Sequence, residues 1–189
     1  MIRSIIFDCF GVLTTEGWLS FKLNHFGHDT DYTREASDLR KQVDGGRLDY
    51  SDFVRRITEM AGITAEKFRQ AVERNAPNEP LFDLIATELK PKYSIGLLSN
   101  AGADRLIQLF GEEKTKLFDA VALSYQTGMV KPQAGAYRDI AEKLEVEPQE
   151  CLFIDDQERY CTGARDTGMQ AIWYKDFDQF KAEIEEILG

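Results

Sequence analysis

The fold of this chain is decided by residues 4–13, which read SIIFDCFGVL. The apolar run at the start of this stretch stops at Asp8, and Gly11 follows three positions later. A short apolar run that ends in this way is typical of a buried parallel strand. Because ligands of open α/β sheets bind beyond the carboxyl ends of the strands, Asp8 stands where chemistry is expected. A single aspartate after a strand also fits an ordinary turn, so its role depends on the other strand ends.

The composition predicts a cytoplasmic protein that binds neither nucleic acid nor membranes. Its 33 acidic and 23 basic residues give a formal net charge of -10, which disfavours polyanionic partners. No apolar run approaches the roughly 18 residues that a membrane span needs, and the N-terminus enters a strand rather than a signal sequence. Cys9, Cys151 and Cys161 have no metal-binding spacing, and we interpret them as free thiols in a reducing compartment.

Residues 16–77 change from the strand pattern to helical periodicity. Leu19, Leu23 and Phe26 recur at spacings of four and three, as on one face of an amphipathic helix. Further apolar residues continue this periodicity, at Leu39, Val43, Leu48, Phe53, Ile57 and Met60. We therefore predict an inserted lobe of four short helices.

Strand and helix patterns alternate from residue 78 onward. Apolar runs predict strands at 93–98, 120–123, 151–154 and 171–174. Helical patterns predict helices at 81–89, 104–110, 136–144, 160–167 and 177–188. With the first strand, this alternation predicts a Rossmann-like α/β fold, a doubly wound parallel sheet of five strands. The core would be discontinuous, formed by residues 1–15 and 78–189, with residues 16–77 inserted as a helical domain.

Polar residues follow three of the predicted strands. Asp8 follows the first strand, Ser99-Asn100 the second and Asp155-Asp156 the fourth. Lys131 lies on a loop between Asn100 and Asp155 in the sequence. If the strands are parallel, these side chains meet at one edge of the sheet. Singly, each fits an ordinary cap, turn or solvated loop. Together they offer carboxylates for a hard cation, a hydroxyl and an amide for phosphate oxygens, and one ammonium group that offsets the carboxylate repulsion.

These four stretches, in this order and at these separations, resemble those of the haloacid dehalogenase superfamily of phosphohydrolases. The later motifs are the most specific: Lys131-Pro132 followed by a helix, then LFIDD at 152–156 and GMQAI at 168–172. The helical insert is similar to the small cap of subfamily I, and the resemblance covers essentially the whole chain. It implies a hydrolase with a helical cap over a Rossmann-like core.

The resemblance also implies roles for the polar residues. Asp8 would be the nucleophile that forms an aspartyl-phosphate, and Lys131 would steady both the nucleophile and the phosphoryl group. Ser99 would bind the phosphoryl group, with Asn100 as an auxiliary phosphate-binding or orienting group. The resemblance further implies a magnesium ion, Mg²⁺, held by oxygen atoms of Asp8, Asp155, Asp156 and the backbone carbonyl of Phe10.

One departure from the family pattern bears on the reaction. The phosphatases usually carry a second aspartate two residues after the nucleophile, which protonates the leaving group, whereas this chain has Phe10. General acid–base help is worth about 10² to 10⁴ in rate, so poor leaving groups should react slowly here. Gln133, Gln157 and Tyr160 are smaller departures. We therefore predict a magnesium-dependent phosphatase of a small phosphorylated metabolite, with reduced general-acid capability.

Two other functions stay open. An aromatic residue at the position of Phe10 is also found in the haloacid dehalogenases, which use the aspartate against carbon, need no metal and bind substrate with an arginine from the cap. Arg34 and Arg40 are available for that role, and spacing does not choose between them. The fold could also survive as a binding or regulatory module with little turnover. Asp155-Asp156 favours the phosphatase over the dehalogenase. Phe10 supports the module, whereas the retention of Asp8, Ser99, Lys131 and Asp156 argues against complete loss of activity.

Substrate selection is expected to reside in the insert. Its candidate groups near the mouth of the site are Glu16, Trp18, Tyr32 and Lys41.

Overall fold

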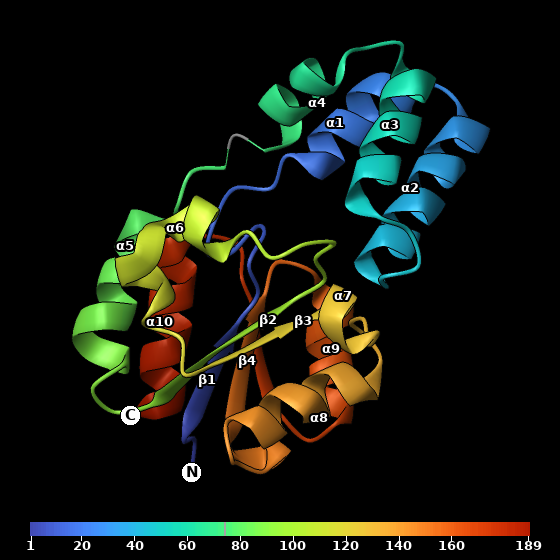
Figure 1. Cartoon of the computed structure of the whole chain (residues 1–189). Helices are drawn as coiled ribbons and strands as arrows, with labels where there is room; N and C mark the ends of the chain where they lie inside the picture. Colours follow the sequence, from blue (N-terminus) through green and yellow to red (C-terminus); the bar gives the residue numbers. More distant parts are fainter. Residues whose placement is uncertain (74) are drawn as a thin grey trace.

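The computed structural model describes residues 1–73 and 75–189. Five parallel strands form one sheet in the order β3-β2-β1-β4-β5 (Figure 1). The strands are β1 (Ser4–Phe7), β2 (Ser94–Ser99), β3 (Ala120–Leu123), β4 (Cys151–Asp155) and β5 (Gln170–Trp173). The central position of β1 explains why its side chains are apolar on both faces: it pairs with β2 on one side and β4 on the other. The prediction of a five-stranded parallel sheet is confirmed.

Helices cover both faces of the sheet (Figure 1). One face carries α5 (Glu79–Leu84), which continues as the π-helix η1 (Ile85–Leu89), together with α6 (Leu106–Thr115) and α10 (Phe177–Leu188). The other carries α7 (Ser124–Thr127), α8 (Ala134–Lys143) and α9 (Glu158–Asp166). Successive residues of β1 point to opposite faces, so Ile5 and Phe7 pack in one apolar cluster and Ile6 in the other.

Two short elements lie outside the sequence prediction. The helix α7 has four residues and the 3₁₀-helix η2 (Pro148–Glu150) has three, too few for a periodic pattern to register. The predicted helix at 104–110 instead begins at Leu106 and runs to Thr115, with Gly111 at a non-helical φ of 73° within it. That angle is accessible to glycine at low cost, so the helix is interrupted by a kink at Gly111 and a second short helical segment follows it.

The segment between β1 and α5 forms four helices: α1 (Trp18–Phe26), α2 (Thr30–Asp44), α3 (Tyr50–Ala61) and α4 (Ala65–Val72). Their buried side chains make an apolar cluster of their own, in which the rings of Phe21 and Phe68 meet edge to face at 5.0 Å. These helices lie beyond the carboxyl ends of the strands (Figure 1). The division of the chain into a core and an inserted domain at residues 15/16 and 77/78 stays a prediction.

The three cysteines are free, as the sequence predicts, and the structure places all three in the interior. Within residues 1–73 and 75–189, none of the helices combines the length and the apolar character that a membrane crossing requires.

Candidate active site

The centre of the site is a buried ammonium group between two carboxylates. The Nζ atom of Lys131 donates to Oδ1 of Asp8 and to Oδ2 of Asp155, at 2.6 Å in each case. Lys131 is 2% exposed, Asp8 6% and Asp155 0%. A charge removed from water to this extent persists only when it is paired, and this geometry gives the ammonium group of Lys131 two carboxyl partners.

The sheet places both carboxylates. Asp8 follows β1 directly, and its backbone N–H donates to the carbonyl of Ile154 on the neighbouring strand at 2.8 Å. Asp155 is the last residue of β4, and its Oδ1 atom accepts from the backbone N–H of Gln157 at 2.8 Å. Because β1 and β4 are adjacent and parallel, their carboxyl ends coincide and the two aspartates meet.

Asp156 completes a cluster that fits a hard divalent cation. Carboxylate oxygens of Asp8, Asp155 and Asp156 lie within 4.8 Å of one another. The Oδ1 atom of Asp156 is buried and has no hydrogen-bond partner in the described part of the chain. Both oxygens of Asp155, in contrast, already accept hydrogen bonds. A set of oxygen ligands that includes a carboxylate oxygen without a hydrogen-bond partner suits Mg²⁺. The backbone carbonyl of Phe10 stays a predicted fourth ligand.

Gly11 lets the chain pass close to Asp156. Its φ of 93° lies in the region that glycine adopts without a steric penalty. A Cβ atom on Gly11 would lie 2.5 Å from Cγ of Asp156, far inside contact distance. The glycine that follows the apolar run in the sequence is therefore required both by the turn and by the carboxylate beside it.

The charges of the cluster are unbalanced, which shifts the pKa values of its members. Burial, reinforced by Asp155 and opposed by Lys131, raises the pKa of Asp8 to about 8. Burial and the charge of Asp155 raise the pKa of Asp156 to about 6. Burial would lower the pKa of Lys131, but Asp155 and Asp8 outweigh it and raise that pKa above its usual value. One ammonium thus faces three carboxylates, and a divalent cation would favour their ionised forms.

Asn100 holds the main chain of Lys131. Its Oδ1 atom accepts from the Lys131 N–H at 2.8 Å, and its Nδ2 atom donates to the Lys131 carbonyl at 3.1 Å. Of the two roles expected for Asn100, this geometry supports orientation. Tyr160 lies against the same lysine: its ring centre is 5.0 Å from Nζ, and its hydroxyl is 3.4 Å from Nδ2 of Asn100. Tyr160 therefore belongs to the support of Lys131 in this chain.

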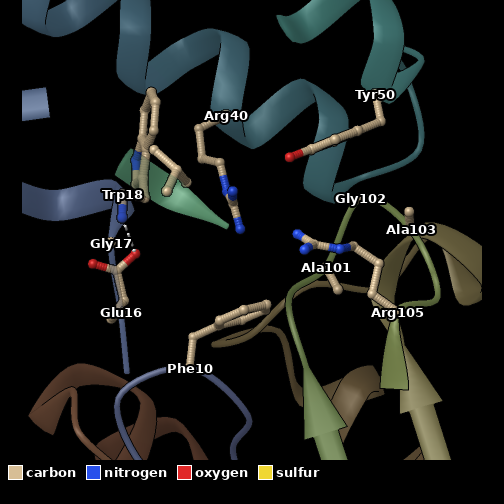
Figure 2. A pocket seen from close by; sticks show the side chains of 11 residues that line it. Phe10, Glu16, Gly17, Trp18, Arg40, Tyr50, Ala101, Gly102, Ala103 and Arg105 are labelled. Carbon is tan, nitrogen blue, oxygen red and sulfur yellow. Dashed lines mark hydrogen bonds between the residues drawn. The ribbon is translucent and has the colours of Figure 1, made fainter. Parts of the chain in front are cut away.

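Ser99 provides a buried hydroxyl group at the edge of the sheet, whereas Phe10 provides an aromatic ring that lines a pocket. Ser99 ends β2 and is 1% exposed, and its hydroxyl has no hydrogen-bond partner within residues 1–73 and 75–189. An unpaired buried hydroxyl at the edge where Asp8 emerges is available to a phosphoryl oxygen. The ring of Phe10 instead lines a pocket between the inserted helices and the core (Figure 2).

That pocket includes some of the substrate-selecting residues expected from sequence. Glu16 and Trp18 line it, whereas Tyr32 and Lys41 do not. Lys41 instead pairs with Asp38 on the surface at 3.0 Å. Three further residues line the pocket, namely Arg40, Tyr50 and Arg105. The sequence by itself assigns none of them a role in binding the substrate of a phosphatase. No sequence signal joins them, because they come from α2, α3 and the loop before α6.

The sequence of this chain is similar to that of known hydrolases. Residues 2–168 match the family model of haloacid dehalogenase-like hydrolases. The chain is 29% identical to bifunctional epoxide hydrolase 2 of Rattus norvegicus over 131 residues, which cover 66% of this chain and 24% of that protein. It is 46% identical to a phosphatase of Mycobacterium tuberculosis over 55 residues, covering 29% of this chain and 25% of that one. The chain thus spans about a quarter of the length of these curated relatives.

Solved structures share the fold. A haloacid dehalogenase family enzyme of Bacteroides thetaiotaomicron, solved with magnesium and inorganic phosphate, matches with a TM-score of 0.73 and 23% identity. The match covers 95% of this chain and 99% of that one. A 2-haloacid dehalogenase of Pseudomonas syringae matches with a TM-score of 0.61 and 17% identity over 94% of this chain and 90% of that one. At these identities the likeness concerns the fold alone.

Proposed function

Because the chain belongs to the family of haloacid dehalogenase-like hydrolases, we propose that it is a magnesium-dependent phosphatase of a small phosphorylated metabolite. The single observation that carries this proposal is the orphaned Oδ1 atom of Asp156 beside the paired carboxylates of Asp8 and Asp155. A reaction at carbon needs a nucleophilic carboxylate and no cation, whereas phosphoryl transfer needs positive charge around the transferred group. The haloacid dehalogenase family enzyme of Bacteroides thetaiotaomicron, which shares this fold, was solved in complex with magnesium and inorganic phosphate, and this complex supports the proposal.

Each residue has a defined task in this mechanism. Oδ2 of Asp8, the oxygen that Lys131 leaves unpaired, attacks phosphorus as the bond from phosphorus to the ester oxygen breaks, and the alcohol leaves after its oxygen takes a proton from water. Water then attacks phosphorus, which breaks the bond to Asp8 and releases inorganic phosphate. Lys131 keeps Asp8 oriented and offsets negative charge that develops on the phosphoryl oxygens. The Ser99 hydroxyl donates to one of these oxygens. Mg²⁺, held by Asp8, Asp155 and Asp156, would supply the remaining positive charge.

Activity on phosphate esters tests the proposal. Purified protein should hydrolyse p-nitrophenyl phosphate when Mg²⁺ is present and should lose this activity on chelation. Asp8→Asn keeps the shape of the side chain but removes the nucleophile, so turnover should fall by several orders of magnitude. Asp83→Asn changes an exposed aspartate of α5 and should leave the rate unchanged. Turnover that survives both chelation and Asp8→Asn would contradict the proposal.

The dehalogenase remains the second candidate because of two residues. Phe10 and Arg40 line the same pocket, whereas Arg34 pairs with Asp31 on the exposed face of α2. An aromatic ring and an arginine near a nucleophilic aspartate are what a haloacid site requires. Release of halide from a 2-haloacid without added metal, together with no turnover of any phosphate ester, would favour this candidate.

A further inference from the structure

The pocket above Phe10 is walled by two arginines that come from opposite sides. Arg40 extends from α2 of the inserted helices, and Arg105 extends from the loop before α6 of the core. Their guanidinium groups point toward each other across the space above the ring of Phe10 (Figure 2). Each guanidinium has a carboxylate of the chain on one side, Asp44 beside Arg40 and Glu73 beside Arg105, so the two groups can face each other without a bound ligand.

Each arginine keeps unused donors. Arg40 donates through Nε to Asp44 at 3.0 Å, and no hydrogen bond of its two terminal amino groups is found in the described part of the chain. Arg105 lies 3.7 Å from Glu73, and its guanidinium likewise makes no hydrogen bond there. A guanidinium group has five N–H donors, so most of the donors of this pair are available to a ligand.

The acidic groups around the pocket are, in contrast, already occupied. The carboxylate of Glu16 accepts from the backbone N–H groups of Trp18 and Leu19, at 2.9 and 2.8 Å, and so caps α1. The carboxylate of Glu73 accepts from the hydroxyl of Tyr50 at 2.6 Å. The acidic side chains that face the pocket are thus engaged by the protein, whereas the two guanidinium groups keep unused donors, which an anionic group requires.

Arg40 also remains charged in this setting. Burial would lower the pKa of its guanidinium, but the adjacent Asp44 outweighs burial and raises that pKa. The ring of Trp18 lies 5.9 Å from the guanidinium carbon and further restricts where the group can point.

Resting on the phosphatase function proposed above, we propose that Arg40 and Arg105 bind a second anionic group, a carboxylate or a phosphate, on the leaving group of the substrate. Phe10 links the two parts of the site, because it lies two residues after Asp8 and its ring forms a wall of the arginine pocket. A phosphomonoester bound at Asp8 would then extend its leaving group over this ring toward the arginines. The substrate is accordingly a phosphorylated acid or a bisphosphate rather than the phosphate of a neutral alcohol.

Matched aryl phosphates test this proposal by kinetics. The substrates are 4-carboxyphenyl phosphate, 1,4-phenylene bisphosphate and 4-carbamoylphenyl phosphate, the last being a neutral isostere of the first. We expect kcat/KM to be about tenfold or more higher for the preferred anionic substrate than for the carbamoyl ester, as a charge-assisted hydrogen-bond pair provides. The better of the two anionic substrates identifies whether the site takes carboxylate or phosphate.

Variants that remove one positive charge test whether Arg40 and Arg105 cause the preference for the anionic ester. Arg40→Gln and Arg105→Gln should each reduce the preference for the anionic ester about tenfold, mainly through KM. Arg34→Gln, which removes the same charge from the exposed face of α2, should keep the preference. If Arg40→Gln fails to fold because Asp44 loses its partner, Arg105→Gln alone decides. An unchanged preference in Arg105→Gln, or no preference in the wild type, would overturn the proposal and leave the phosphatase function intact.

A binding measurement separates this proposal from the phosphatase function. Titration calorimetry compares 4-hydroxybenzoate with 4-hydroxybenzamide on the wild type and on Arg105→Gln, without any turnover. Tighter binding of the carboxylate that Arg105→Gln abolishes supports the anion site even if no phosphate ester is hydrolysed. Equal binding of the acid and the amide to the wild type, in a protein that hydrolyses no ester, would overturn both proposals.

Discussion

The Nζ atom of Lys131 lies 2.6 Å from Oδ1 of Asp8, and this contact joins residues that are 123 positions apart in the sequence. The same ammonium group contacts Asp155, so a single cation sits among three carboxylates at the carboxyl edge of the sheet. The buried site is therefore short of positive charge. Its stability, its pH dependence and its reactivity all follow from that deficit.

Replacement of Lys131 tests how much the buried pair contributes to stability. Lys131→Met keeps the length of the side chain but leaves Asp8 and Asp155 buried beside no cation, which should lower the free energy of unfolding by about 3 kcal/mol at neutral pH. Lys143→Met removes an exposed pair with Asp139 and should cost less than about 1 kcal/mol. Urea denaturation without metal measures both. Equal losses would show that burial adds nothing to the pair.

The pH dependence of stability tests the protonation of Asp8. Its pKa is about 8 in the folded protein, whereas an aspartate in the unfolded chain has an ordinary pKa of 3.8, so between these values the folded state holds a proton that the unfolded state has released. The free energy of unfolding should therefore fall as pH rises from about 4 to 8, by at most about 1.4 kcal/mol per pH unit from this one group.

Asp8→Asn provides the control for this pH effect. Asp155, Asp156 and Lys131 face the same position in both proteins, so the difference between wild type and variant isolates Asp8. Urea denaturation of the metal-free proteins at pH 6 and pH 8 should show the wild type losing more stability over this interval. Parallel pH profiles would contradict the raised pKa of Asp8.

A pair of glycine replacements tests the close approach of the first loop to Asp156. Gly11→Ala and Gly62→Ala both place a side chain at positive φ, which costs about 1 kcal/mol or more. Only at Gly11 does the new Cβ also collide with Asp156, whereas at Gly62 nothing lies within 4 Å. Gly11→Ala should be the more destabilising and should weaken Mg²⁺ binding, as calorimetry would show. Unchanged Mg²⁺ affinity in Gly11→Ala would separate Asp156 from the cation site.

Restoring a carboxylate at residue 10 tests the missing general acid. The wild type should hydrolyse acyl and aryl phosphates much faster than alkyl phosphates, because good leaving groups need no proton. Phe10→Asp should narrow this difference about tenfold or more by speeding the alkyl esters, since the ring lines an open pocket where a carboxylate has room. Phe10→Asn has the same size but no acidic proton and should not narrow it. Equal wild-type rates on alkyl and aryl esters would contradict this prediction.

The sequence by itself determined the sheet and the residues at its functional edge. The apolar run before Asp8 and the later strand and helix alternation predict parallel strands, and parallel strands bring their carboxyl ends to one edge. Asp8, Asp155 and Asp156 lie close together for that reason. A position of Lys131 beside them is expected as well, because buried carboxylates require a cation. A pattern along the chain is sufficient here, since the order of elements fixes which ends coincide.

Only the tertiary structure decided what the side chains around this edge contact. Asn100 turns its amide to the main chain of Lys131, and Arg40 and Arg105 line the pocket above Phe10 from different sides (Figure 2). Periodicity reports which face of a helix is apolar, but it carries no information on how inserted helices are rotated and set down against a sheet. The position of Arg40 depends on that placement, which is fixed by packing between segments far apart in the sequence. For this reason the sequence predicts the cluster of polar residues at the edge of the sheet, whereas the pocket above Phe10 is known only from the tertiary structure.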